Sequence, residues 1–165
     1  MDIFKKIFWG ESDSPQSAED LYEQGKDLVL AAHYRDAIEV LDLALKQSHG
    51  HVNALFERGK AKAGIKDYKG AVADFNKVIA IQPKNASAYH RRAKAKDFLK
   101  DYKGALEDLD VAIRLQPDFS IALYERALLK IMAMKDKKSG YGDLKTAGGL
   151  GLTIAYDALR EFFNE

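Results

Sequence analysis

The stretch Lys66-Asp67-Tyr68-Lys69-Gly70-Ala71 recurs 34 residues later as Lys100-Asp101-Tyr102-Lys103-Gly104-Ala105. Each copy is a short polar turn that leads into a helix-like pattern of apolar residues. The Gly-Ala pair at its end has little side-chain volume, so a second helix can approach closely at that point. A repeat of this length is typical of stacked helix–turn–helix units, and we therefore align the whole chain on the 34-residue period.

Five sets of equivalent positions follow this period from Ala18 onward. In the predicted first helix of each repeat a large residue is followed by a small one, and in the second helix the order is small, large, small. Closely packed antiparallel helices require this alternation, because small residues let the backbones approach and large residues fill the groove beside them. Pro83 and Pro117 end two of the repeats, since proline cannot continue a helix. The sets are Leu21/Leu55/Tyr89/Leu123, Gly25/Gly59/Ala93/Ala127, Ala37/Ala71/Ala105/Gly140, Leu41/Phe75/Leu109/Leu144 and Ala44/Val78/Ala112/Ala147.

This alternation, with the closing prolines, resembles the tetratricopeptide repeat, and the chain is identified as a member of that family, of the small bacterial adaptor type. The resemblance implies an all-α fold, a right-handed superhelical solenoid of antiparallel helix pairs that ends in a C-terminal capping helix. On this alignment we expect a flexible N-terminal segment at 1–17, four repeats at 18–51, 52–85, 86–119 and 120–154, and the capping helix at 155–165.

Two of the repeats depart from the pattern. In the first repeat Ser48-His49-Gly50-His51 replaces the proline turn, and we expect Gly50 to end the helix. His49 and His51 are expected to be solvated loop residues, because a metal site needs more ligands than this turn supplies. The fourth repeat has one residue more than the others, and we place the extra residue in the polar turn 135–139.

Composition argues against several classes of function. The net charge of +1 gives no electrostatic reason to expect nucleic acid as a partner or contact with an anionic membrane. The absence of cysteine excludes disulfides, thiol catalysis and thiolate metal sites. The motifs supply no convergent acid, base and nucleophile. We therefore expect a cytoplasmic protein that is not an enzyme and has no catalytic residues, no metal site and no cofactor.

The resemblance places the first helices on the concave face of the solenoid, where equivalent positions form ladders of side chains. One ladder is mainly aromatic and another is cationic, and such a surface suits a peptide that carries carboxylates and apolar anchors. The sequence thus predicts a scaffold or adaptor that binds a peptide segment of a partner protein in this groove. Alternatively, the aromatic residues are half-buried packing residues. The expected groove residues are Tyr22, Lys26, Phe56, Lys60, His90, Arg91, Lys94 and Tyr124.

A subset of the family binds the C-terminal carboxylates of heat-shock chaperones through a five-residue clamp. The resemblance would require Lys, Asn, Asn, Lys and Arg at positions 22, 26, 57, 87 and 91, in that order. The chain matches the clamp only at the last position, and an acidic residue at 57 would repel a carboxylate. We therefore expect no chaperone clamp. The residues present are Tyr22, Lys26, Glu57, Ser87 and Arg91.

Two further hypotheses for the groove remain open. In the first, the apolar and basic stretch Met1–Trp9 of one chain docks on another copy and produces a homo-oligomer. In the second, the aligned residues Lys26, Lys60 and Lys94 bind RNA, although the neighbouring acidic residues argue against it. Membrane contact through Met1–Trp9 is the weakest hypothesis, because so short a stretch buries little apolar area.

Overall fold

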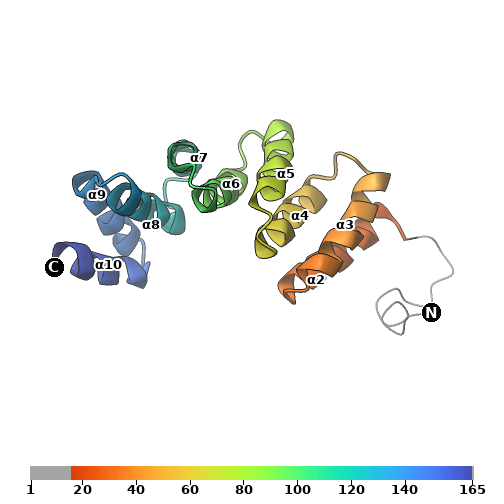
Figure 1. Cartoon of the computed structure of the whole chain (residues 1–165), viewed down its shortest axis with the longest axis horizontal. Helices are drawn as coiled ribbons and strands as arrows, with labels where there is room; N and C mark the ends of the chain where they lie inside the picture. The colour runs from red at the N-terminus through yellow and green to blue at the C-terminus, as the bar shows by residue number, and fades with distance from the viewer. Residues whose placement is uncertain (1–15, 165) are drawn as a thin grey trace.

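The described part of the chain is entirely helical. The computed structural model describes residues 16–164, and within this range the backbone forms nine α-helices and one π-helical segment, with no β-strand. Successive helix pairs stack side by side along one axis, which confirms the predicted all-α solenoid (Figure 1). The elements are α2 (Ala18–Leu30), α3 (Tyr34–Gln47), α4 (Val52–Gly64), α5 (Tyr68–Ile81), α6 (Ala86–Phe98), α7 (Tyr102–Leu115), α8 (Ser120–Leu128), the π-helical segment η1 (Leu129–Ala133), α9 (Lys137–Gly149) and α10 (Thr153–Phe163).

Nearly all of the predicted N-terminal segment 1–17, including the stretch Met1–Trp9, lies outside the described residues. At the other end, α10 occupies the range where the sequence predicts a capping helix. Its buried residues Ala155, Ala158 and Leu159 join Leu144 and Ala147 of α9 in one apolar cluster. The last helix therefore covers apolar surface of the fourth repeat.

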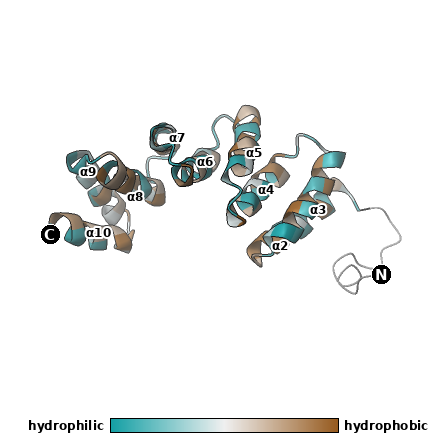
Figure 2. Cartoon of the chain, in the orientation of Figure 1, coloured by the Kyte–Doolittle hydropathy of each residue, from teal (hydrophilic) through white to brown (hydrophobic). Residues whose placement is uncertain are grey.

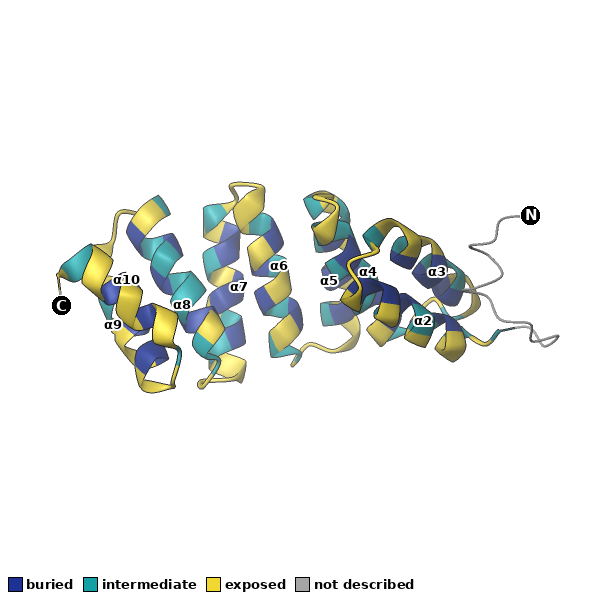
Figure 3. Ribbon diagram, turned by 90° about the horizontal axis from the view of Figure 1, so that it is seen from below, coloured by how far each residue is buried: buried dark blue, intermediate teal, exposed yellow. Residues whose placement is uncertain are grey.

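Small residues mark the points where the two helices of a pair approach most closely. A Cβ atom added at Gly25 would lie 2.5 Å from Cγ of Leu41, and one added at Gly59 would lie 2.8 Å from the ring of Phe75. Both separations are too short for packed carbon atoms, so each large residue fills space that the facing glycine leaves free. The result is a buried, mainly apolar stripe along each helix (Figures 2 and 3).

The aspartate of the recurring stretch caps the second helix of its repeat. Asp67 accepts a hydrogen bond from the backbone nitrogen of Gly70 at 2.9 Å, which satisfies one of the free donors at the start of α5. The residue before it, Lys66, has a φ of 66°, and this left-handed conformation reverses the chain between the two helices. The same caps are made by Asp101 to Gly104 and by Asp136 to Ser139.

The extra residue of the fourth repeat lies in η1, and its predicted place in the turn 135–139 was wrong. In the second and third repeats, the nitrogen of the capping aspartate bonds to the carbonyl of the lysine five positions before it, Lys62 or Lys96. In the fourth repeat, Asp136 bonds instead to Lys130, six positions before it. A π-helical turn takes one residue more than an α-helical turn. The insertion is therefore absorbed within the helix, and the turn keeps its shape.

The end of the first repeat also differs from its prediction. Helix α3 ends at Gln47, and Gly50 does not have the left-handed φ that would make it the helix stop. His51 is not a solvated histidine, because its ring caps α4 by accepting a hydrogen bond from Ala54 N at 3.2 Å. Its Nε2 lies 3.0 Å from a carboxylate oxygen of Glu19. The histidine thus joins the first repeat to the second.

A buried carboxylate lies between the two helices of each of the last three repeats. In the second repeat, Asp74 is 2% exposed and accepts hydrogen bonds from Arg58 Nε at 2.9 Å and Arg58 Nη2 at 2.5 Å. Lys62 Nζ lies 2.8 Å from the same carboxylate. A buried charge requires such complete pairing. We call this triad and its equivalents, Arg92/Lys96/Asp108 and Arg126/Lys130/Asp143, the charged layer.

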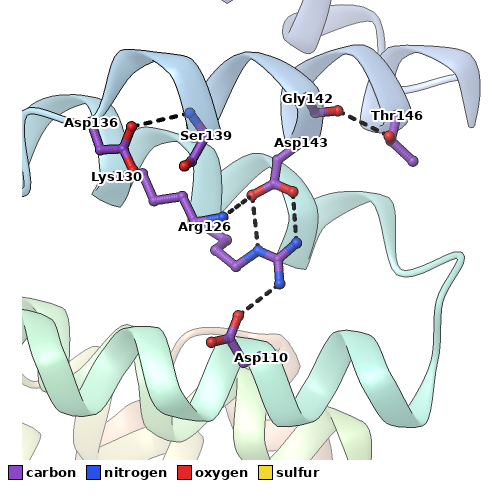
Figure 4. Close-up of polar contacts among 8 residues, drawn as sticks. All are labelled: Asp110, Arg126, Lys130, Asp136, Ser139, Gly142, Asp143 and Thr146. Carbon is purple, nitrogen blue, oxygen red and sulfur yellow. Dashed lines mark hydrogen bonds and ion pairs between the residues drawn. The ribbon is translucent and has the colours of Figure 1, made fainter.

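Each arginine of the charged layer also reaches the preceding repeat. Arg126, on α8, holds Asp143 of α9 through two nitrogens, while its third nitrogen donates to Asp110 of α7 at 2.7 Å (Figure 4). One guanidinium group therefore joins three helices and two repeats. Arg58 and Arg92 make the equivalent contacts with Asp42 and Asn76, both at 2.6 Å.

We predict that Asp108→Ala lowers the free energy of unfolding by about 3–5 kcal/mol, because it leaves the partly buried Arg92 and Lys96 without their carboxylate. Urea unfolding of the full chain, followed by circular dichroism, measures this loss. Asp110→Ala on the same helix is the matched control. Its side chain is 55% exposed, so its ion pair should contribute less than about 1 kcal/mol. Equal losses for the two variants would contradict a structural role for the buried carboxylate.

Candidate functional site

The predicted groove residues lie on α2, α4, α6 and α8, the first helices of the four repeats, but their exposure is uneven. Arg91 and Lys94 are exposed, whereas His90 is only 6% exposed. The others are partly buried: Tyr22, Lys26, Phe56, Lys60 and Tyr124. The aromatic ladder therefore presents less free surface than the sequence predicts.

Two of the predicted aromatic residues contribute to internal packing. The ring of Tyr22 lies 5.1 Å from the ring of His51, and the ring of Phe56 meets that of Phe75 edge to face at 5.7 Å. Such pairs stabilise the contact between neighbouring helices. These side chains thus combine a packing role with the part of their surface that remains open.

His90 forms a contact between repeats. Its Nε2 lies 2.7 Å from Oε2 of Glu125, and its ring lies 4.8 Å from the ring of Phe119. Lys94 Nζ lies 3.3 Å from the other oxygen of Glu125. Burial alone would raise the pKa of Glu125, but the hydrogen bond and charge of His90 and the charge of Lys94 outweigh it, so the pKa lies below its ordinary value of 4.5. The contacts of His90 and Lys94 with Glu125 therefore join α6 to α8.

Two cavities lie side by side along the first helices. Cavity I, of about 550 Å³, lies between the third and fourth repeats, and its apolar wall includes Tyr102, Tyr124, Leu128 and Met132. Cavity II, of about 400 Å³, lies between the first three repeats. Phe98 and Lys94 line both cavities. Of the eight predicted residues, Lys60, Arg91, Lys94 and Tyr124 line a cavity, whereas Tyr22, Lys26, Phe56 and His90 line neither.

The most exposed aromatic side chain of this surface is one that the sequence reasoning missed. Phe98 is 55% exposed and stacks on Tyr68, with ring centroids 4.5 Å apart and planes 5° apart. Leu30 and Met132, also largely exposed, occupy the equivalent positions of the first and fourth repeats. Leu30, Phe98 and Met132 are separated by multiples of the 34-residue period, with Gly64 at the position between the first two, and this spacing could have identified the apolar residues at the C-terminal ends of the first helices.

Most charges along this surface are already paired. Lys26 and Lys60 each form an ion pair with the glutamate three residues before them, Glu23 and Glu57. In contrast, Arg91 and Asp97, both exposed on α6, form no ion pair with any described residue. Arg91 lines cavity II and Asp97 lines cavity I. The two cavities therefore carry opposite unpaired charges.

Other kinds of site find little support in the range 16–164. In that range no group of three or more His, Cys, Asp or Glu side chains is placed to hold a metal ion. A membrane-crossing helix would need a longer and more apolar stretch than any helix there provides. The two cavities are therefore the best-formed candidate binding surface of the described chain.

Comparison with known proteins supports the fold and the repeat pattern. The tetratricopeptide repeat model matches residues 52–85 and 86–119. No curated protein sequence matches the chain at a significant level. Among solved structures, MamA residues 41 to the end from Desulfovibrio magneticus RS-1 is 25% identical, with a TM-score of 0.78 over 83% of this chain and 77% of that one.

Two further solved structures share the fold at lower identity. A crystal structure of MamA is 22% identical, with a TM-score of 0.80 over 93% of this chain and 87% of that one. The first tetratricopeptide domain of Spaghetti (RPAP3), solved with an HSP90 peptide bound, is 22% identical, with a TM-score of 0.69 over 76% of this chain and 99% of that one. Both likenesses concern the fold alone.

We predict that Glu125→Gln lowers the free energy of unfolding by about 1 kcal/mol at pH 7, through its weaker contacts with His90 and Lys94. A carboxyl group whose pKa is lowered on folding contributes stability above its unfolded pKa and loses it as the pH falls through the folded pKa. The difference between wild type and variant should therefore shrink below pH 4.5. Urea unfolding at several pH values measures it.

Glu23→Gln is the control for this prediction, because Glu23 is the equivalent residue of the first repeat and its side chain is 51% exposed. It should change stability little at any pH. A pH-independent loss in Glu125→Gln would show that the ionised pair is not the source of the stability.

Proposed function

We propose that this chain, in which residues 52–85 and 86–119 match the tetratricopeptide repeat model, is a scaffold or adaptor that binds a peptide segment of a partner protein along its first helices. One observation carries the proposal: two apolar cavities adjoin on this surface and share the exposed ring of Phe98. Exposed aromatic rings beside well-formed cavities are typical of the anchor points that dominate binding energy in protein interfaces.

The shape of the surface favours an extended or helical segment over a small molecule. The cavities follow one another along the stacked helices α2, α4, α6 and α8, so a single peptide can place successive side chains in both. Paired lysines at the edge supply polar contacts without a strong net charge. The proposed binding residues are Phe98 and Met132 together with the four predicted residues that line a cavity, Lys60, Arg91, Lys94 and Tyr124.

The proposed partner is not a chaperone C-terminus. Of the five clamp positions only Arg91 carries the required residue, and Glu57 is already held by Lys60 at 2.7 Å. A free terminal carboxylate placed beside Glu57 would be repelled. We propose a binding role in the cytoplasm without catalysis and without a nucleic-acid partner. The lysines that would contact RNA phosphates are already paired with glutamates, Lys26 and Lys60 within their own helices and Lys94 with Glu125 of α8.

Self-assembly is a second candidate, favoured by the composition of Met1–Trp9. This stretch combines six large apolar residues with two lysines, so it has the apolar anchors that the cavities suit. In this arrangement one copy supplies the peptide and another copy the groove. Its partner chemistry is the same as in the first proposal, and only the source of the peptide differs.

Selection from a random dodecapeptide display library on the immobilised full chain tests the first proposal. We predict that a selected peptide dissociates about 10-fold faster or more from Phe98→Ala and from Tyr124→Ala, since aromatic anchors contribute most of the interface energy. Lys77→Ala and Arg114→Ala, on exposed faces of the second helices α5 and α7, are the matched controls. If these controls abolish binding while the groove variants bind normally, the convex surface is the functional one.

Sedimentation of the full chain and of a chain lacking residues 1–15 tests self-assembly. The deletion keeps Ser17, whose side chain caps α2, so we predict an unchanged helical circular-dichroism spectrum. An oligomer that forms only with residues 1–15 present supports self-assembly. Identical sedimentation of the two forms would remove that candidate and leave the partner-peptide proposal intact.

A further inference from the structure

The two cavities differ in chemistry as well as in position. Cavity II is lined by three cations, Lys60, Arg91 and Lys94, and by no carboxylate. Cavity I is lined by Asp97, Glu125 and Lys94. The rest of each cavity lining is mainly apolar, so each cavity can hold a large apolar side chain of a ligand. The charged lining residues then determine which charge the ligand can carry next to that side chain.

Ion pairs within the chain leave one unpaired charge at each cavity. Lys60 is held by Glu57 at 2.7 Å, and Lys94 lies 3.3 Å from Glu125, which also contacts His90. Arg91 and Asp97 remain, because neither has an ion-pair partner among residues 16–164. They stand six positions apart on α6, one at each cavity. The two neighbouring cavities therefore carry opposite charges, negative at cavity I and positive at cavity II.

Cavity I owes its apolar character to the fourth repeat. Leu128 occupies the position that carries Lys26, Lys60 and Lys94 in the first three repeats. Four positions further along, in η1, Met132 is 59% exposed. A leucine and a methionine thus replace the lysine ladder at this end, and methionine adapts easily to the shape of a bound side chain.

Burial also makes Asp97 sensitive to a ligand. Its partial burial and the nearby charge of Glu125 raise its pKa, although Lys94 acts in the opposite direction. A carboxylate in such a place is stabilised when a cation approaches it.

We propose that the groove reads the direction of its peptide: the bound segment places large apolar side chains on both sides of Phe98, an acidic residue beside Arg91 and a basic residue beside Asp97. This rests on the proposed function and names the chemistry of the partner. Opposite charges at the two cavities fix one orientation, because the reversed peptide would place like charges together at both cavities. A uniformly acidic segment matches only cavity II.

The test uses a peptide obtained by selection from the dodecapeptide library on the full chain, together with a synthetic analogue in which its acidic and basic residues exchange places. Wild type should bind the exchanged analogue about 10-fold more weakly or worse. The double variant Arg91→Glu/Asp97→Arg should prefer the exchanged analogue, with its helical spectrum unchanged because both side chains are exposed. Lys77→Glu/Arg114→Glu on the second helices is the matched control and should keep the wild-type preference.

The possible outcomes separate the two proposals. Reversal of the preference in the double variant supports the directional groove. If wild type binds both peptides equally but loses them on Phe98→Ala, the groove binds peptides without reading direction, and only this inference is overturned. If no selected peptide depends on Phe98 or Tyr124, the proposed function falls together with it.

Discussion

The bidentate contact between a buried aspartate and an arginine of the facing helix is the interaction on which this fold depends. In each of the last three repeats the carboxylate is sealed between two helices, so any separation of the helices would expose an unpaired charge. The third nitrogen of each arginine donates a hydrogen bond to a residue of the preceding repeat, which is Asp42, Asn76 or Asp110. A solenoid has no long-range contacts to fix its curvature, and a bridge between neighbouring repeats supplies that restraint locally.

This arrangement also explains why the binding surface lies where it does. The arginine and lysine of each triad use the face of the first helix that meets the second helices, which leaves another face of α4, α6 and α8 open to solvent. Arg91 and Arg92 illustrate the division: Arg92 holds Asp108 in the charged layer, whereas its neighbour Arg91 lines cavity II without an ion pair. Neighbouring residues in the sequence can therefore have separate roles: Arg92 stabilises the fold, and Arg91 contributes to the chemistry of the groove.

The period of the sequence was enough to predict the helices, their pairing and the small residues at the close contacts, because these depend on side-chain volume at fixed spacing. It did not locate the inserted residue. Lys62, Lys96 and Lys130 keep the 34-residue spacing while Asp67, Asp101 and Asp136 do not, and only a comparison of both sets places the extra residue between Lys130 and Asp136. The site was predicted in part, since equal sequence positions such as His90 and Tyr124 meet different neighbours. Burial of His90 depends on Phe119, in the turn before α8, and on Glu125 of the next repeat, and the set of equivalent positions that contains His90 includes neither residue.

The methionines of the chain offer the most direct test of the central claim, that a peptide binds in the groove between the third and fourth repeats. Only three methionines are present, so labelling of their methyl groups with ¹³C gives three resonances in the nuclear magnetic resonance spectrum of the full chain. Met132 lines cavity I, whereas Met134, two residues away and also exposed, lines neither cavity. On titration with a selected peptide, we predict that the Met132 resonance shifts to saturation while that of Met134 stays in place. A saturable shift of Met134 without a shift of Met132 would contradict it.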